Sequence, residues 1–200
     1  MTSLDAIRQR LATYEPELSR PPERPNAEAA VAIVLHEAGP GALELLFIER
    51  AVREGDPWSG QMAFPGGRRD PVDPNLEATA TRETLEEVGV ELGKPIGRLD
   101  DFAGTRHRKL QSLVVAPYVY ELAKRPRTIP NQEVNDTVWV PLPWILHPDS
   151  AIEYHFRHPE FEDRVPALRY RSFTIWGLTY RVLSNFVEVL DRSLPSHQRG

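Results

Sequence analysis

Three glutamates, Glu83, Glu86 and Glu87, follow one another at positions i, i+3 and i+4 of a helix-like segment. On a helix this spacing places the three carboxylates on one side, where like charges repel unless cations compensate them. Carboxylate oxygens are the ligands that Mg²⁺ and Mn²⁺ prefer in proteins. We therefore predict that these glutamates bind metal, while Arg82 pins Glu86 as its i+4 neighbour. A solvated helix face with chance charge clustering is the alternative.

The segment before this helix could bind phosphate. Residues 64–67 read Phe-Pro-Gly-Gly, and glycines allow backbone N–H groups to approach phosphate oxygens closely. Nearby arginines could clamp a diphosphate, although solvation is the default for a surface arginine. The predicted substrate-binding residues are Arg50, Gly66, Gly67, Arg68 and Arg69.

Together these residues resemble the Nudix box, whose pattern is Gly-x5-Glu-x7-Arg-Glu-U-x-Glu-Glu-x-Gly-U, with U usually a bulky aliphatic residue. Residues 82–90 match its second half, except that Thr84 stands at an aliphatic position. The first half needs one extra residue to align Gly67 with the glycine and Asp73 with the first acid. The box then covers about residues 67–90, and a role for Asp73 or Glu77 stays open.

Other segments resemble the coenzyme A pyrophosphatase branch of that family. They are the Phe-Pro-Gly-Gly-x-x-Asp-x-x-Asp run at 64–73, Val-Ala-Pro-Tyr-Val at 115–119 and Ile-Trp-Gly-Leu-Thr at 175–179. The branch's Leu-Leu-Thr-x-Arg-Ser signature is degraded at residues 46–51, which keep the arginine, Arg50, but lose the Thr and the Ser. The resemblance implies an enzyme that uses Mg²⁺ or Mn²⁺, held by Glu83, Glu86 and Glu87, to split coenzyme A into 3′,5′-ADP and 4′-phosphopantetheine. Alternatives are ADP-ribose or dinucleotide substrates, a ligand-binding module without turnover, and a protein-interaction domain.

Further residues could take part in this chemistry. A box glutamate or Glu133 could accept the proton of the attacking water, although a solvated loop charge explains Glu133 more simply. The basic cluster 106–109 could receive a 3′-phosphate, or form a charged hairpin tip. His155 and His158 are interpreted as surface histidines rather than metal ligands. Trp176 is interpreted as a core residue rather than a platform for adenine.

Hydrophobic periodicity predicts the elements that position these residues. Helices are expected at about 3–13, at 74–88 with Asp73 as N-cap and Gly89 as the C-terminal residue, and at 173–191. On the central helix, Ala78, Thr81, Leu85 and Val88 are expected to pack. The strand candidates are 28–36 and 43–51, which could pair as a hairpin, followed by 96–102, 112–121 and 137–140. This pattern predicts an α/β fold, a Nudix-like α/β/α sandwich with a mixed β-sheet, in a single domain over residues 1–200.

Composition restricts the partners. The net charge of −5 lacks the basic footprint of a nucleic-acid or membrane binder, which favours a small-molecule diphosphate substrate. The longest apolar run, 29–35, is far shorter than the roughly 20 residues that span a bilayer, and no signal pattern is seen. We expect a cytoplasmic protein, monomeric or homodimeric. The absence of cysteine excludes disulfides and thiolate chemistry.

Overall fold

The computed structural model describes residues 3–19, 28–53, 59–104, 113–158 and 161–197. The main helices are α1 (Leu4–Thr13), α2 (Leu76–Val88) and α4 (Gly177–Val189), with a short α3 (Leu142–Ile145) and a 3₁₀ turn (Pro148–Ser150) between them in the chain. The strands of the main sheet are β1 (Glu28–Glu37), β2 (Leu43–Arg50), β3 (Met62–Ala63), β4 (Gly66–Arg68), β5 (Gly97–Arg98), β6 (Phe102–Gly104), β7 (Leu113–Leu122) and β8 (Val134–Pro141). A second sheet contains β9 (Ala151–His158), β10 (Phe161–Tyr170) and β11 (Phe173–Ile175).

The main sheet is mixed, as predicted. Its central path is β3-β2-β1-β7-β5, while β4 pairs with β1, β6 with β7, and β8 with β2. Strands β1 and β7 are parallel, from Glu28 opposite Val114 to His36 opposite Leu122, and the other pairs are antiparallel. The hairpin of β1 and β2 is therefore confirmed.

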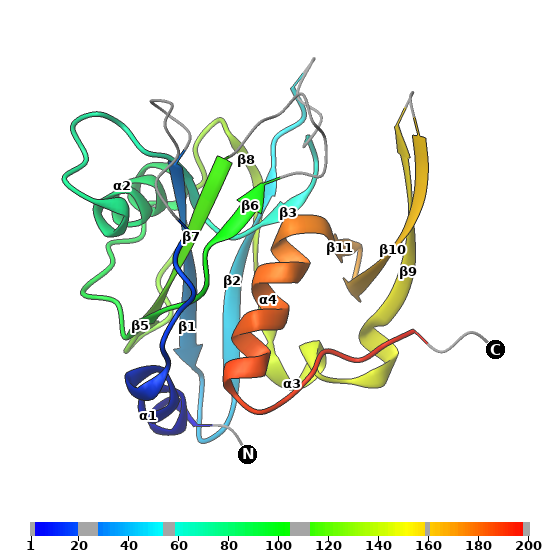
Figure 1. Cartoon of the computed structure of the whole chain (residues 1–200), viewed down its shortest axis with the longest axis horizontal. Coiled ribbons are helices and arrows are strands. Elements are labelled where there is room, and N and C mark those ends of the chain that lie inside the picture. The colour runs from blue at the N-terminus through cyan, green and yellow to red at the C-terminus, as the bar shows by residue number, and fades with distance from the viewer. Residues whose placement is uncertain (1–2, 20–27, 54–58, 105–112, 159–160, 198–200) are drawn as a thin grey trace.

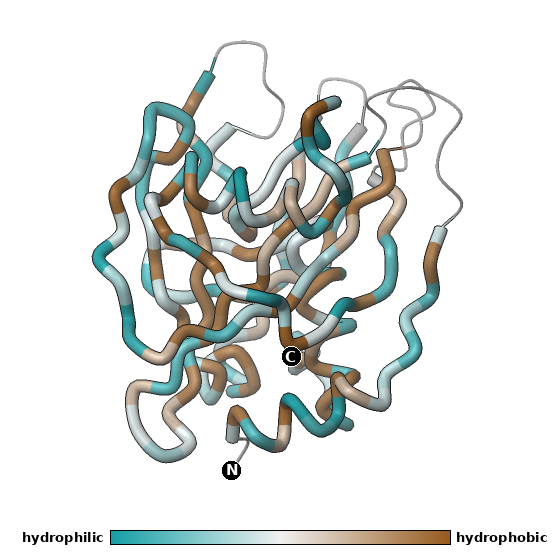
Figure 2. Tube along the Cα trace, turned by 90° about the vertical axis from the view of Figure 1, so that its left-hand side faces the viewer, coloured by the Kyte–Doolittle hydropathy of each residue, from teal (hydrophilic) through white to brown (hydrophobic). Residues whose placement is uncertain are grey.

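The sheet separates two apolar layers. Along β2, Leu45 and Phe47 join the cluster that includes α4, whereas Leu46 and Ile48 join the cluster that includes α2. This alternation follows from the two-residue period of a strand. Helices α2 and α4 thus lie apart with strands between them (Figure 1), and hydrophobic residues concentrate along the interior strands (Figure 2). No helix in the described ranges is long and apolar enough to span a membrane.

Three local predictions were wrong. Helix α2 begins at Leu76, because Asn75 is the N-cap and its Oδ1 accepts from the Ala78 N–H at 2.8 Å. The C-terminal helix begins at Gly177, because residues 173–175 form strand β11 against β10. The predicted strand 96–102 is two short strands, β5 and β6, that both pair with β7. The hairpin of β9 and β10 was not predicted at all.

Candidate active site

Helix α2 buries only part of the face that we predicted: Val88 is fully buried, as expected, and Ala78 and Thr81 are half-buried. Leu85 is 47% exposed, whereas Thr84 is fully buried and its hydroxyl donates to the Ala80 carbonyl at 2.7 Å. Glu87, at i+3 from Thr84, is only 3% exposed. The buried face therefore carries a carboxylate, and the prediction that Leu85 packs inward is wrong.

Glu87 is held against the glycine loop. Its Oε2 accepts from the Gly66 N–H at 2.8 Å. Gly66 has a φ of +149°, and a Cβ there would lie 2.2 Å from the Ala30 carbonyl oxygen, so only glycine is accommodated. Burial raises the pKa of Glu87 to about 7; the Gly66 hydrogen bond opposes that shift, and the charge of Glu83 adds to it. A cation beside Glu87 would stabilise its ionised form.

Glu83 lies against the second glycine of the same loop. A Cβ on Gly67 would be 2.5 Å from the carboxyl carbon of Glu83. Burial raises the pKa of Glu83, while the neighbouring Arg82 lowers it. Two carboxylates thus share a partly dehydrated space beside backbone that could approach a ligand closely.

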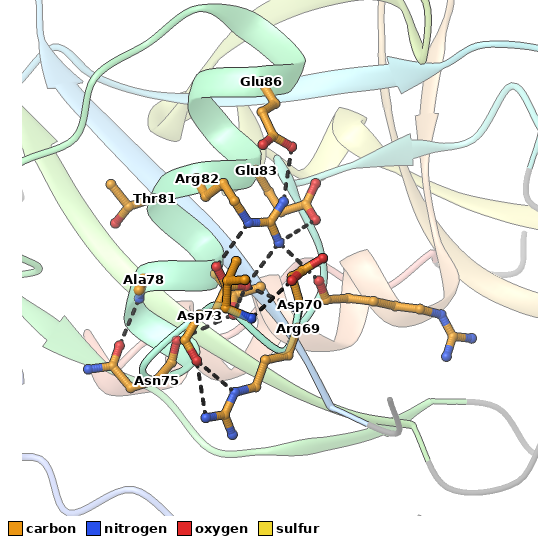
Figure 3. Close-up of polar contacts among 12 residues, drawn as sticks. Arg69, Asp70, Asp73, Asn75, Ala78, Thr81, Arg82, Glu83 and Glu86 are labelled. Carbon is orange, nitrogen blue, oxygen red and sulfur yellow. Dashed lines mark hydrogen bonds and ion pairs between the residues drawn. The ribbon is translucent and has the colours of Figure 1, made fainter. Parts of the chain in front are cut away.

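Arg82 organises the site from the centre of an ion-pair network (Figure 3). Its Nε and Nη2 donate to the two oxygens of Asp73, each at 3.0 Å. The same guanidinium contacts Glu83 at 3.0 Å and Glu86 at 2.9 Å. The expected pairing of Arg82 with Glu86 is confirmed, but the guanidinium also fixes two other carboxylates.

The sequence left the role of Asp73 open, and the structure shows its partners. It is 6% exposed and accepts from the Thr79 hydroxyl and the Asp70 N–H, both at 2.9 Å. The Arg82 guanidinium lowers the pKa of Asp73 to about 2, with smaller contributions from the Asp70 and Thr79 hydrogen bonds that offset burial. Asp73 is not the N-cap of α2 but the buried anion that orients Arg82. The offset alignment to the Nudix box was the signal that pointed to it.

The carboxylates suit a divalent cation, although they do not converge as a ligand set. Glu86 turns to Arg82 and its side chain is 54% exposed, whereas Glu87 turns to Gly66. In the described ranges, no three acidic, histidine or cysteine side chains are grouped to hold a metal ion. The donor chemistry is right for Mg²⁺ or Mn²⁺, and burial, to which neighbouring carboxylates add, raises the pKa of both Glu83 and Glu87. The metal site at Glu83, Glu86 and Glu87 stays a prediction.

The predicted phosphate-binding arginines differ in their surroundings. Arg50 lies near enough to Glu87 for its charge to lower that residue's pKa. Arg68 is exposed, and its carbonyl accepts from Arg82 at 3.2 Å. Arg69 instead fixes the loop, because it contacts Glu28 at 2.9 Å and donates to the Asp73 carbonyl.

The remaining candidates are distributed around the site. Glu133 contacts Arg53 at 3.1 Å, and its charge adds to the raised pKa of Glu83 and Glu87, which places it within electrostatic reach. His155 contacts Glu162 at 3.2 Å. Half-buried Trp176 packs between aromatic rings. The basic cluster 106–109 lies outside the described residues, as does the side chain of His158.

Residues 25–161 match the model of the NUDIX domain. The chain belongs to the Nudix family. It is 31% identical over 156 residues to the human mitochondrial coenzyme A diphosphatase, covering 76% of this chain and 65% of that one. It is also 36% identical over 112 residues to the mouse peroxisomal coenzyme A diphosphatase, covering 54% and 44%.

A solved structure agrees on the fold of this Nudix protein. The MutT/nudix family protein from Enterococcus faecalis superposes with a TM-score of 0.57 over 95% of this chain and 70% of that chain, at 20% identity. The chain spans about half to two thirds of the length of the first curated relatives that it matches. Over the matched residues the chain is thus similar to Nudix hydrolases.

Proposed function

We propose that this Nudix pyrophosphohydrolase splits the diphosphate of coenzyme A or a derivative, with Mg²⁺ or Mn²⁺ held by Glu83, Glu86 and Glu87. The observation that carries the proposal is the pairing of two partly dehydrated carboxylates with the Gly66–Gly67 backbone. Such a site has strong affinity for cations and close access for phosphate oxygens.

The chain's own residues then have separate tasks. Gly66 fixes Glu87, and Asp73 fixes Arg82. Arg82 in turn holds Glu83 and Glu86 on the loop side of α2. Bound metal would neutralise the diphosphate and lower the pKa of a water molecule. Glu87, whose pKa is raised by burial, or Glu133 would accept the proton of that water. Arg50 and Arg68 would contact phosphate oxygens.

The choice of coenzyme A rests on relatives and on sequence. Two of the relatives compared above are named coenzyme A diphosphatases. The branch-like segments at 64–73, 115–119 and 175–179 support the same substrate. ADP-ribose and dinucleotides are the second candidates, since they share the nucleoside diphosphate linkage. The products of coenzyme A cleavage would be 3′,5′-ADP and 4′-phosphopantetheine.

The proposal includes one catalytic domain over residues 1–200, acting as a monomer or homodimer. Composition favours the cytoplasm, whereas the names of two relatives refer to mitochondria and peroxisomes. Imaging of the tagged full chain in its host, with size-exclusion chromatography and light scattering, tests the compartment and the oligomeric state.

A substrate panel tests the reaction. Coenzyme A, 3′-dephospho-coenzyme A, ADP-ribose and a diadenosine polyphosphate are each incubated with Mg²⁺ and with Mn²⁺, and products are identified by mass. We expect the highest kcat/KM for coenzyme A. Turnover of only ADP-ribose or the dinucleotide would overturn the choice of substrate, and no turnover of any compound would overturn the reaction.

A further inference from the structure

A cavity lies beside the Nudix box, between the main sheet and the β9–β11 sheet. It has a volume of about 500 Å³, within the range of small-molecule sites. Strand β11 follows the turn after β10 and lies near β3 (Figure 1). The lining residues used below are Glu49, Gln61, Tyr154, Phe156 and Trp176. Neither the metal-binding prediction nor the phosphate-binding prediction uses this cavity.

One wall of the cavity is aromatic. Tyr154 and Phe156 are two residues apart on β9, and their ring centroids each lie 4.8 Å from the centroid of Trp176. The interplanar angles of 34° and 37° show that the rings flank the indole at a tilt rather than stack on it. All three side chains are only half-buried. Such a wall offers ring surface to a planar group.

The charge of the described lining does not favour the phosphate end of a substrate. None of the described residues that line the cavity is lysine or arginine, and His155, which also lines it, contacts Glu162 at 3.2 Å. The lining does contain Glu49, half-buried, one of whose carboxylate oxygens accepts from the Asn135 amide. Carboxylates accept hydrogen bonds and repel phosphate. The cavity therefore favours a neutral group that carries N–H donors.

The end of strand β2 contributes residues both to the cavity and to the surroundings of Glu87. Ile48 belongs to the apolar cluster on the α2 side of the sheet, and Arg50, two residues later, acts electrostatically on Glu87 on that same side. Glu49, between them, lines the cavity. The Arg50 N–H donates to the carbonyl of Gln61, another lining residue, at 3.0 Å. A single strand end thus separates the phosphate-binding arginine from the aromatic wall.

We propose that this cavity is the specificity subsite for the nucleobase of the substrate, and that it takes an amino-substituted purine. The ring lies against the Tyr154–Phe156–Trp176 wall, and its exocyclic amine donates to Glu49. This inference rests on the proposed function, because it assigns the base end of the same nucleoside diphosphate. It also gives Trp176 the ligand-facing role that the sequence alone did not favour.

Binding of the product to the intact chain tests the base assignment. In titration calorimetry, 3′,5′-ADP should bind about tenfold more tightly than the corresponding inosine bisphosphate, because a carboxylate repels the carbonyl that replaces the amine. In Glu49→Gln the preference should fall to about twofold or less, since an amide both donates and accepts. Glu153→Gln is the matched control on β9; its carboxylate contacts Arg164 and does not line the cavity. Equal affinity of the parent chain for the two compounds would overturn the proposal.

The aromatic wall is tested separately. Trp176→Leu should weaken both bisphosphates by at least about fivefold, whereas Trp144→Leu, which removes an indole stacked on His147 outside the cavity, should not. Thermal midpoints of both variants report on folding. If Trp176→Leu instead weakens 4′-phosphopantetheine and spares 3′,5′-ADP, the cavity holds the other end of the substrate and the nucleobase assignment is wrong. If the chain binds 3′,5′-ADP more tightly than the inosine compound but does not hydrolyse coenzyme A, the proposed function is wrong and the nucleobase subsite still holds.

Discussion

At the scale of single residues, the carboxylates of the site differ in their hydrogen-bond and ion-pair partners. Arg82 contacts Asp73, Glu83 and Glu86 together, so removing its guanidinium would leave three carboxylates close together without a cation. Glu87 has only a backbone N–H as its hydrogen-bond donor in the described ranges. The Arg82 guanidinium therefore lowers the pKa of Asp73, whereas burial, which the Gly66 hydrogen bond only partly offsets, raises that of Glu87.

Asp73→Asn gives a prediction about pH. Because the folded pKa of Asp73 is about 2, below the value of roughly 3.9 for an unfolded chain, its charge stabilises the fold above about pH 4. That contribution disappears as the pH falls towards 2. We expect the variant to lose about 1.5–3 kcal/mol of unfolding free energy at pH 7, the range for hydrogen bonds to charged groups. Urea unfolding of the parent protein and of Asp73→Asn at several pH values measures this loss. A difference in unfolding free energy between the two that does not narrow from pH 4 to pH 2 would contradict the role of Asp73.

The two loop glycines should respond differently to alanine. Gly66→Ala meets backbone at 2.2 Å with a positive φ, so we expect marked loss of thermal stability. Gly67→Ala meets only the end of the Glu83 side chain, so the fold should survive while the displaced carboxylate lowers activity at least about tenfold. Gly93→Ala, with nothing within 4 Å, is the control. Full activity of Gly67→Ala would remove Glu83 from the site.

At the scale of elements, the sequence predicted what periodicity and end signals carry. The β1–β2 hairpin, the Gly89 end of α2 and a helix near the C-terminus were correct, because apolar spacing and a left-handed glycine are local signals. Of the α2 residues expected to pack, Val88 is buried but Leu85 is exposed, because tertiary packing places Thr84 and Glu87 inside. The β9–β10 hairpin is rich in charged residues, which masks its strand pattern.

Helix α2 therefore provides a direct comparison of its two faces. Val88 is fully buried, so Val88→Ala should destabilise the protein by about 2 kcal/mol or more. Leu85→Ala, at an exposed position, should change the unfolding free energy by no more than about 0.5 kcal/mol. Chemical denaturation of both variants measures the difference. A larger loss in Leu85→Ala than in Val88→Ala would mean that the helix is rotated relative to the structure described above.

At the scale of the whole molecule, the sheet brings together parts that are distant in sequence. Strand β2 ends in Arg50 near the box; β3 pairs with β2, and β4, which contains Gly66 and Gly67, pairs with β1. The same end of β2 meets the cavity beside the second sheet. No local sequence pattern predicts that the end of β2 lies near both the box and the cavity, because this arrangement arises from strand pairing between remote segments.

One measurement tests whether the glutamates of α2 hold a catalytic metal. Hydrolysis of coenzyme A is compared for the parent chain, Glu86→Gln and Glu87→Gln, with Mg²⁺ and with Mn²⁺. Each variant should lower kcat/KM by at least about a hundredfold, because it removes a metal-binding carboxylate. Glu86 is exposed, and Glu87→Gln keeps its shape while removing a buried charge, so neither thermal midpoint should fall. We expect folded, nearly inactive variants and a parent protein that yields 3′,5′-ADP and 4′-phosphopantetheine. Near-normal turnover in either folded variant would contradict it.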